Sequence, residues 1–394
     1  MDYLHRAWAE IDLDALENNY NIIRGRLKRE TKVLCVIKAD AYGHGADSLA
    51  KEYERLGCDW FAVSNIEEAL RLREVGIRRP ILILGATPPE YAARLAEAKI
   101  TQALYSYDFA ERLSRCACEA GVQVDVHLKL DSGMRRIGFD CADEEQLSLA
   151  CRACRLDGIN VTGAFTHFAS ADADGDPDGS FTRLQFERFV SATRFVENSG
   201  IKLQIRHCCN SAATICYPEM QLDMVREGIT LYGLAPGPKV DITGFKPMMS
   251  LKAGVSMVKR VAAGEDISYG RTFTAERDME VATVPIGYAD GYLRAYAAGY
   301  ALIKGRRAKI VGRVCMDQLM LDVTGLDVSA GDTVTLFGRD GDSELPVEEL
   351  SELASTINYE TVCLITKRVP RVYIKGGKIV GVADDILVFK GDRL

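Results

Sequence analysis

The sequence predicts an α/β protein in which a (β/α)8 TIM-like barrel is followed by a mostly-β C-terminal domain. From residue 31 to residue 233, eight short apolar runs alternate with amphipathic helical patterns, as in a barrel of parallel strands. After residue 244 the segments become short, β-branched and separated by glycines, which indicates a β domain. The length of 394 residues also suggests two domains. An open doubly wound sheet shows the same alternation, but the number of strands favours the barrel.

The predicted barrel strands are the apolar runs at residues 32–38, 60–64, 81–85, 102–106, 123–131, 160–168, 203–210 and 224–231. Helical patterns lie between them at residues 65–75, 88–99, 107–120, 144–156 and 181–198. The first of these helices follows Ser64-x-x-Glu67, which has the spacing of a capping box. We expect residues 12–244 to form the barrel and residues 245–394 to form the β domain, to which residues 1–11 add a strand. Gly376 and Gly377 separate two β-branched runs and predict a hairpin.

The composition is that of a globular enzyme and excludes several other classes. Hydrophobic residues make up 47% and charged residues 27% of the chain, and the net charge is -7. Without a Lys/Arg cluster on a predicted helix, we expect no nucleic-acid partner. No apolar run reaches the roughly 18 residues of a membrane helix, so we expect no membrane partner. The first ten residues are partly acidic and lack the apolar core of a secretory signal, which favours a cytoplasmic protein.

The cysteines and acidic residues do not form a metal-site pattern. Twelve cysteines are present without the spacing of a disulfide scaffold, and Cys151 and Cys154 are a lone C-x-x-C inside a helical pattern, so packed thiols in a reducing cytosol are expected. The acidic segment 171–179 superficially resembles a calcium loop, but Pro177 and Arg183 stand where the loop needs glycine and glutamate. We therefore expect no metal.

The segment from Val36 to Gly45 carries the most chemical information. Lys38 stands where an apolar strand runs into a glycine-flanked turn. An ammonium in that position needs a partner, a lowered pKa or a covalent role. Schiff-base formation with pyridoxal phosphate is the covalent role that favours lysine. The alternative is a strand-end lysine whose ammonium extends to water.

Barrel enzymes carry their active sites at the C-terminal ends of the strands, so the candidate site residues at these ends are expected to lie together. They are Lys38, Lys129, Asp131, Arg135, Arg136, His167, Asn210, Ser211, Arg226, Gly228 and Ile229. The last strands have the features of a phosphate site. Ser211 opens a short helix and offers a hydroxyl, although a plain N-cap is its alternative role. Gly228 allows the backbone of Ile229 to approach an anion closely, and Tyr42 offers another hydroxyl.

Arg226 is predicted to point into the barrel, because it shares a strand face with Met224 and Gly228. A buried guanidinium needs acceptors; a pyridine nitrogen is one candidate and a structural carboxylate is the other. Because arginine stays protonated, a ring nitrogen beside it would stay unprotonated. That weakens the cofactor as an electron sink and suits a proton that moves on and off one carbon.

Seven motifs closely resemble those of the alanine racemase family, and they keep the same order across both predicted domains. They are VIKADAYGHG (36–45), KLDSGMRRIGF (129–139), VREGI (225–229), ISYG (267–270), PIGYADG (285–291), GRVCMD (312–317) and INYE (357–360). The resemblance implies a homodimer with shared active sites. It also implies a small-molecule amino-acid substrate, with L-alanine and D-alanine interconverted on pyridoxal 5'-phosphate to supply D-alanine for peptidoglycan.

The same resemblance implies a role for individual residues. Lys38 resembles the Schiff-base lysine and one of two bases, and Tyr269 resembles the base on the opposite face, contributed by the partner subunit. His167 and Arg226 would tune Tyr269, and Asp317 would support catalysis. The remaining implied roles are cofactor binding by Tyr42, His167, Asn210, Ser211, Arg226, Gly228, Ile229 and Tyr359, carboxylate binding by Arg136 and the backbone of Met316, carbamylation of Lys129, and substrate entry past Asp172, Tyr288, Arg294, Arg313 and Ile357.

Three other functions remain as alternatives. The first is a serine or broader-specificity racemase of the same fold; Tyr359 favours alanine, because related serine racemases often lack this tyrosine. A barrel-type decarboxylase would place a carboxylate at the ring nitrogen, where this chain offers Arg226. A pyridoxal-phosphate homeostasis protein would be a lone barrel, without the second domain that carries Tyr269.

Overall fold

The structure is a computed structural model that describes Tyr3 and residues 5–386. The chain divides into two compact units, which are described separately below. The barrel unit consists of Glu17–Ala41 and Ala46–Lys246, and the β unit of Met1–Leu16, Tyr42–Gly45 and Pro247–Leu394. No helix among the described residues has both the length and the apolar character needed to cross a membrane.

Eight parallel strands form the wall of the barrel unit, in the order β10-β2-β3-β4-β5-β6-β8-β9. They are β2 (Lys32–Val36), β3 (Trp60–Val63), β4 (Ile81–Ile83), β5 (Ile100–Leu104), β6 (Val124–Asp131), β8 (Ile159–Phe165), β9 (Ile205–His207) and β10 (Met224–Glu227). A backbone hydrogen bond of 3.1 Å from Arg226 N to Cys209 O joins β10 to the chain leaving β9 and draws the ends of the sheet together. The predicted barrel is confirmed.

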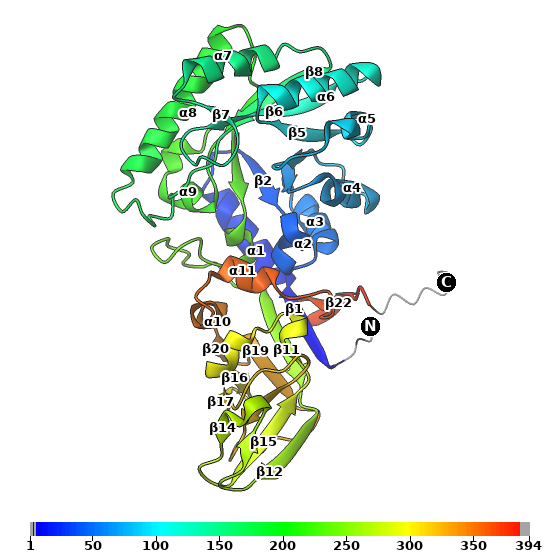
Figure 1. The fold of residues 1–394 in the computed structure, drawn as a ribbon, viewed down its shortest axis with the longest axis vertical. Helices are drawn as coiled ribbons and strands as arrows, with labels where there is room; N and C mark the ends of the chain where they lie inside the picture. The colour runs from blue at the N-terminus through cyan, green and yellow to red at the C-terminus, as the bar shows by residue number, and fades with distance from the viewer. Residues whose placement is uncertain (1–2, 4, 387–394) are drawn as a thin grey trace, which may run out of the picture. The chain divides into compact units, whose positions relative to one another are not determined.

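Helices cover the outside of this wall, as Figure 1 shows for α4 to α8. Two helices cross the boundary of the unit along the chain, α1 (Leu13–Gly25) and α2 (Lys38–Gly43). The other helical segments of the unit and its short strand are α3 (Ala46–Arg55), α4 (Ile66–Glu74), η1 (Pro89–Tyr91), α5 (Ala92–Glu97), α6 (Tyr107–Glu119), β7 (Phe139–Asp140), α7 (Glu144–Ala153), α8 (Ser180–Asn198), α9 (Ser211–Cys216), η2 (Pro218–Met220) and η3 (Ile229–Tyr232). Because both faces of a parallel strand are covered, consecutive apolar residues such as Val33, Leu34 and Cys35 are all fully buried.

Two local predictions were wrong in detail. Helix α4 is capped one residue later than the predicted box: Asn65 Oδ1 accepts from Glu68 N at 3.0 Å, and the Glu68 carboxylate accepts from Ser64 N at 2.7 Å. Strand β2 ends at Val36, and Lys38 begins α2 instead of ending the strand. Both differences arise at element ends, where side-chain hydrogen bonds compete with the regular backbone pattern.

The β unit is built on a sheet in the order β12-β15-β18-β17-β16-β19-β11-β1-β21-β22, with β20 paired to β19. Its elements are β1 (Ala7–Asp12), β11 (Met249–Gly254), β12 (Met257–Val261), β13 (Asp266–Ile267), η4 (Tyr269–Arg271), β14 (Phe273–Thr274), β15 (Met279–Val284), η5 (Tyr288–Asp290), η6 (Arg294–Ala298), β16 (Tyr300–Ile303), β17 (Arg306–Ile310), β18 (Leu319–Asp322), β19 (Thr333–Asp340), β20 (Ser343–Leu345), α10 (Val347–Leu353), α11 (Asn358–Cys363), β21 (Arg371–Lys375) and β22 (Lys378–Ala383). The mostly-β second domain is confirmed.

Two predictions about this sheet are also confirmed. The N-terminal strand β1 pairs antiparallel with β11 and parallel with β21, so it belongs to the β unit. Strands β21 and β22 form an antiparallel hairpin, and Gly376 and Gly377 take positive φ angles between them.

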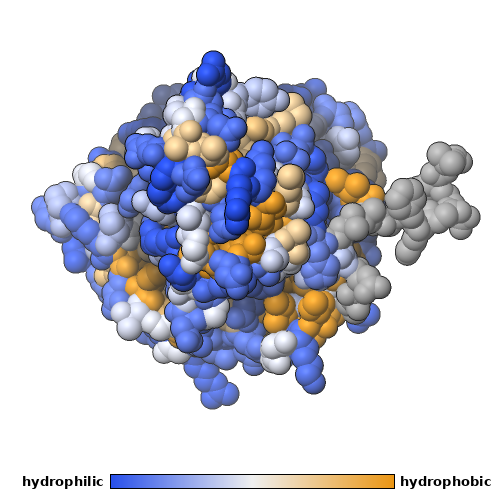
Figure 2. Space-filling view, turned by 90° about the horizontal axis from the view of Figure 1, so that it is seen from below, coloured by the Kyte–Doolittle hydropathy of each residue, from blue (hydrophilic) through white to orange (hydrophobic). Residues whose placement is uncertain are grey.

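Figure 2 shows hydrophilic residues over most of the face seen from below, with hydrophobic residues in small groups between them.

Candidate active site

Lys38 opens a left-handed helical turn at the C-terminal end of β2. The four residues from Ala39 to Tyr42 all have φ between 51° and 54°, although each left-handed non-glycine residue costs about 1–2 kcal/mol. Side chains hold the turn: Glu68 Oε1 accepts from Ala39 N at 2.7 Å, and Asp40 Oδ1 accepts from Ala46 N at 2.8 Å. Backbone strain of this kind persists where the surroundings over-determine it, and it is concentrated at functional sites.

The charges of four cationic side chains act on His167 at the same end of the barrel, and Arg226 contacts its ring directly. Burial lowers the pKa of its imidazole well below the ordinary value, and the nearby charges lower it further; they belong to Arg226, Arg136, Lys129 and Lys38. The ring is therefore neutral at physiological pH. The structure thus brings together predicted site residues that follow or end four different strands, β2, β6, β8 and β10.

Arg226 is buried in the centre of this cluster and donates in two directions. Its Nη1 contacts His207 O at 3.1 Å and His207 Nδ1 at 3.2 Å. Its Nη2 contacts Thr166 O at 2.8 Å, Cys208 O at 3.0 Å and His167 Nδ1 at 3.2 Å. Within residues 5–386 no acceptor engages Nε, which leaves it as the remaining donor. Burial lowers the pKa of the guanidinium to about 10, so it stays charged at neutral pH.

The arginine determines which nitrogens of its neighbours carry hydrogen, because a guanidinium only donates. We therefore assign the Nδ1 atoms of His167 and His207 as acceptors, which places the hydrogen of each neutral ring on Nε2. His207 Nε2 lies 2.9 Å from His127 Nδ1, and His127 therefore carries its own hydrogen on Nε2 as well. That last donor is buried without a partner among the described residues, which typically costs about 1–3 kcal/mol.

Hydroxyl and backbone groups of the predicted phosphate site lie together at the ends of β9 and β10. Asn210, and not Ser211, is the N-cap of α9, since its Oδ1 accepts from Ala213 N at 3.0 Å. The Ser211 hydroxyl instead accepts from Gly228 N at 2.9 Å and belongs to one hydrogen-bonded group with Thr230 and Glu227. Thr230 lies 2.9 Å from the Ser211 hydroxyl and 2.8 Å from the buried carboxyl of Glu227. Ile229 is fully buried at the start of η3.

Lys129 is almost fully buried on β6 and contacts aromatic and backbone groups. Its Nζ donates to Leu130 O at 2.9 Å and lies 5.5 Å from the centroid of Phe165. Burial lowers the pKa of its ammonium to about 8, with further lowering by the charges of Arg226 and Arg136. About a tenth of this amine is therefore uncharged at pH 7, and the uncharged amine is the form that carbamylation needs. Carbamylation of Lys129 stays a prediction.

The acidic segment near Asp172 has a structural role. The Asp176 carboxylate accepts from Phe181 N at 3.0 Å and from Thr182 N and Oγ1, each at 2.8 Å, and so secures the start of α8. Within the described part of the chain, no group of three or more potential metal-ligating side chains is arranged around one point. Asp172 packs against Gly237, and its predicted role at a substrate entry stays a prediction.

Two further cofactor candidates, Tyr42 and Tyr359, lie together in the β unit. Their ring centroids are 6.1 Å apart, and burial raises the pKa of the Tyr42 phenol. The segment that carries Tyr42 is tied to this unit, because the buried guanidinium of Arg371 donates from Nε to Gly43 O at 2.9 Å. The residues immediately after the Lys38 turn are therefore anchored by β21.

Tyr269 projects from a tight turn of the β unit and is 72% exposed. Its neighbours Ser268 and Gly270 both have positive φ angles. The Ser268 hydroxyl donates to Arg313 O at 2.9 Å, which fixes the turn against residues 312–313. The phenol is thus presented outward on a firmly held backbone.

Met316 and Tyr288 are brought together in the same unit. Tyr288 N donates to Cys315 O at 3.1 Å, and Ala289 N donates to Met316 O at 3.0 Å. This close approach requires glycine at position 287, where an added Cβ would lie 2.2 Å from Cys315 O. The Met316 N–H has no acceptor among residues 5–386, so it is available to a ligand.

The other predicted residues of the β unit are exposed on its surface. Asp317 forms an ion pair with Arg368 at 2.8 Å, which the sequence did not indicate. Arg294, Arg313 and Ile357 are exposed. Their roles at a substrate entry, and a supporting role of Asp317 in catalysis, stay predictions.

Sequence reasoning missed His127, His207 and Glu227. His127 was detectable in principle, because it alternates with Lys129 on β6 and therefore shares the same face of that strand. The contact between His127 and His207 joins residues 80 positions apart and carries no local signal.

Comparison with known proteins covers both units. The family described as "Alanine racemase, N-terminal domain" matches residues 11–236, and "Alanine racemase, C-terminal domain" matches residues 248–373. A protein named alanine racemase from Desulforamulus reducens is 44% identical over 371 residues, which is 93% of this chain and 98% of that protein.

Solved structures show the same likeness. An alanine racemase structure from Clostridium difficile has a TM-score of 0.93 at 39% identity, covering 98% of this chain and 100% of that one. The alanine racemase of Bacillus anthracis with bound L-Ala-P has a TM-score of 0.92 at 34% identity, covering 98% of this chain and 99% of that one.

Proposed function

Because the chain belongs to the alanine racemase family, it is a pyridoxal-phosphate-dependent isomerase, and we propose that Lys38 and Tyr269 are the bases with which it interconverts L-alanine and D-alanine. The product D-alanine would serve peptidoglycan synthesis. The observation that carries the assignment of Lys38 is its place at the start of the left-handed turn after β2, at the C-terminal end of the barrel, where its charge acts on His167. Such an end is where barrel enzymes assemble their active sites.

The residues of the barrel unit fit pyridoxal phosphate. The Ser211 hydroxyl, held by Gly228 N, and the backbone at Ile229 would hold the phosphate. Arg226 Nε would donate to the pyridine nitrogen, since both Nη atoms are already engaged. When bound, the cofactor would supply an electron-withdrawing ring that stabilises negative charge at the substrate α-carbon. Tyr42 and Tyr359 of the β unit are proposed as further phosphate ligands.

The protein's own groups would then move one proton. Lys38 Nζ would remove or return the α-proton on one face of the substrate, and the Tyr269 hydroxyl would do so on the other. Arg136 and the Met316 N–H would hold the substrate carboxylate in place. The permanently charged Arg226 would keep the ring nitrogen unprotonated, which limits charge build-up and favours simple proton return over side reactions.

The exposure of Tyr269 supports a homodimer. Its ring is 72% exposed in the single chain, as are 60% of Ile357 and 53% of Met316. A phenol that acts as a base needs a site from which water is excluded. We therefore propose that a second copy of this chain covers these residues, so that each site uses Lys38 of one subunit and Tyr269 of the other. The domain boundaries that we propose remain 12–244 for the barrel and 245–394, with 1–11, for the β domain.

A cytoplasmic location is proposed together with this function. All twelve cysteines, which lie within the described residues, are free thiols, and a reducing compartment suits them.

The decisive experiment compares turnover of L-alanine, L-serine and larger amino acids by the purified protein. We expect L-alanine to be racemised fastest and Lys38→Ala to be inactive and to trap no cofactor on borohydride reduction. Lys99→Ala is the matched control, because Lys99 lies at the opposite end of the barrel strands. Full activity of Lys38→Ala would overturn the assignment. A mixture of Lys38→Ala and Tyr269→Ala proteins should regain activity if sites are shared, and no recovery after proven subunit exchange would refute sharing.

A further inference from the structure

A line of contacting side chains runs through the barrel from Arg226 toward the opposite end. Arg226 Nη1 lies 3.2 Å from His207 Nδ1, and His207 Nε2 lies 2.9 Å from His127 Nδ1. The His127 ring then packs on Trp60, with 5.1 Å between the ring centroids. Arg226, His207 and His127 lie on β10, β9 and β6, so the line exists only in the closed barrel.

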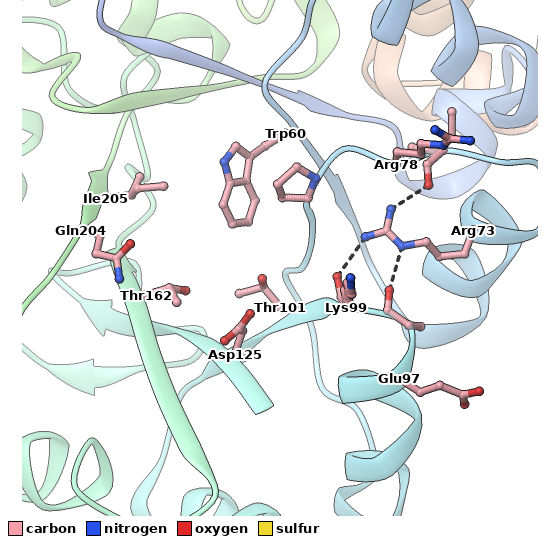
Figure 3. A pocket seen from close by; sticks show the side chains of 13 residues that line it. Trp60, Arg73, Arg78, Glu97, Lys99, Thr101, Asp125, Thr162, Gln204 and Ile205 are labelled. Carbon is pink, nitrogen blue, oxygen red and sulfur yellow. Dashed lines mark hydrogen bonds between the residues drawn. The ribbon is translucent and has the colours of Figure 1, made fainter. Parts of the chain in front are cut away.

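Trp60 marks the far end of this line. It lines a cavity of about 750 Å³ together with Thr101, Asp125 and Ile205, which stand near the N-terminal ends of their strands. Figure 3 shows these side chains around one space, with Arg73 held by backbone carbonyl groups at its side. The hydrogen-bonded part of the line therefore ends at His127, beneath the Trp60 ring that borders the cavity.

Three features hold His127 and His207 in one arrangement. The Phe165 ring stacks on His207 at 5.1 Å with an interplanar angle of 9°. Gly163 leaves room for His127, because an added Cβ there would lie 2.8 Å from His127 Nε2. Arg226 only donates, so His207 can offer a lone pair to it only while its own hydrogen is on Nε2 and is accepted by His127. If either imidazole carried its hydrogen on Nδ1 instead, that hydrogen would face another donor: the Arg226 N–H in the case of His207, and the His207 Nε2–H in the case of His127.

We propose that His127 is a positioning residue of the racemase: by accepting the His207 Nε2 hydrogen, it keeps His207 Nδ1 available as an acceptor for Arg226. This inference rests on the proposed function, since Arg226 matters as the group that faces the cofactor ring nitrogen. It also explains why a buried Nε2 donor without a partner is retained at His127. An ordinary core histidine would be replaceable by any side chain of similar shape.

Two substitutions separate positioning from packing. His127→Asn keeps an acceptor oxygen near the place of Nδ1, whereas His127→Leu fills a similar volume without one. We expect His127→Leu to lower kcat about tenfold, the effect of losing one hydrogen bond to a buried donor, and to shift the visible absorption of the bound cofactor. We expect His127→Asn to stay within about twofold of the natural protein in kcat. Equal effects of the two variants would overturn the proposal.

The tautomers can be measured directly on the holoenzyme, because the chain has only five histidines. With ¹⁵N-labelled histidine, we expect His127 and His207 to show a protonated Nε2 and an unprotonated Nδ1 that do not titrate between pH 5.5 and 9. Burial lowers the pKa of His127 to about 3, and burial with the charge of Arg226 lowers that of His207 well below its ordinary value.

In His127→Leu, the His207 Nε2 signal should move, and in His127→Asn it should not. A protonated Nδ1 on His207 in the natural protein would overturn the proposal without any variant. Because this measurement needs no turnover, a protein that shows the expected tautomers but does not racemise alanine would refute the proposed function and not the hydrogen-bond chain.

Discussion

Gly163→Ala should destabilise the barrel, because the position has no room for a methyl group. An added Cβ at Gly163, on β8, would lie 2.5 Å from Ile205 O on β9 and 2.8 Å from His127 Nε2. Neither neighbour is a flexible side-chain end, so the strands must shift apart. Overpacking of this kind destabilises the folded protein by about 1–3 kcal/mol. Alanine also restricts the unfolded chain more than glycine does, which stabilises the folded protein by about 0.4–1 kcal/mol. We expect a net loss of roughly 1–2 kcal/mol in the free energy of unfolding.

Urea unfolding of the cofactor-free protein would measure this loss without a contribution from ligand binding. The chain has two tryptophans, Trp8 in the β unit and Trp60 in the barrel unit, so a Trp8→Phe background leaves Trp60 fluorescence as a reporter of the barrel. Gly25→Ala is the matched control, since its added Cβ meets nothing within 4 Å. If Gly163→Ala unfolds at the same urea concentration as Gly25→Ala, the steric reasoning is refuted.

Three further predictions concern charge and the phosphate site. The pKa of Lys129 is about 8 in the folded chain against an ordinary 10.5. The unfolded chain therefore takes up this proton first, and the free energy of unfolding should fall by on the order of 3 kcal/mol as the pH drops from 10.5 to 8. Lys129→Met should remove this pH dependence in urea unfolding at stepped pH. Burial raises the pKa of Glu227, so its stabilising contribution is full below about pH 4.3 and lost as the pH rises through the folded-state pKa; Glu227→Gln should flatten that decline in thermal unfolding, and an unchanged decline would contradict the assignment. Ser211→Ala removes the acceptor of Gly228 N and should weaken pyridoxal phosphate binding about tenfold in a fluorescence titration, with unaltered affinity as the contrary result.

Much of the fold and the strand-end positions of the site could be predicted, because they depend on local patterns. A period of two, or a short apolar run bounded by turn residues, favours a strand, and eight such runs in alternation with helices leave few topologies. The same patterns predict that Lys38, Lys129, His167 and Arg226 lie at one end of the barrel. Element ends were less predictable, and the cap of α4 at Asn65 shows why: neighbouring polar side chains compete for the same backbone donors.

The sequence by itself determined the alternation of strands and helices, the order of the motifs, and which residue types stand at the strand ends. Only the tertiary structure decided that Ala39 to Tyr42 form a left-handed turn, since no glycine among these residues indicates positive φ angles. It also decided the hydrogen positions on His167, His207 and His127, which follow from a donor-only arginine on another strand. The physical reason is that hydrophobic periodicity depends on a few neighbouring residues. Backbone strain and the hydrogen positions on the histidines depend instead on groups that come into contact only when the barrel closes.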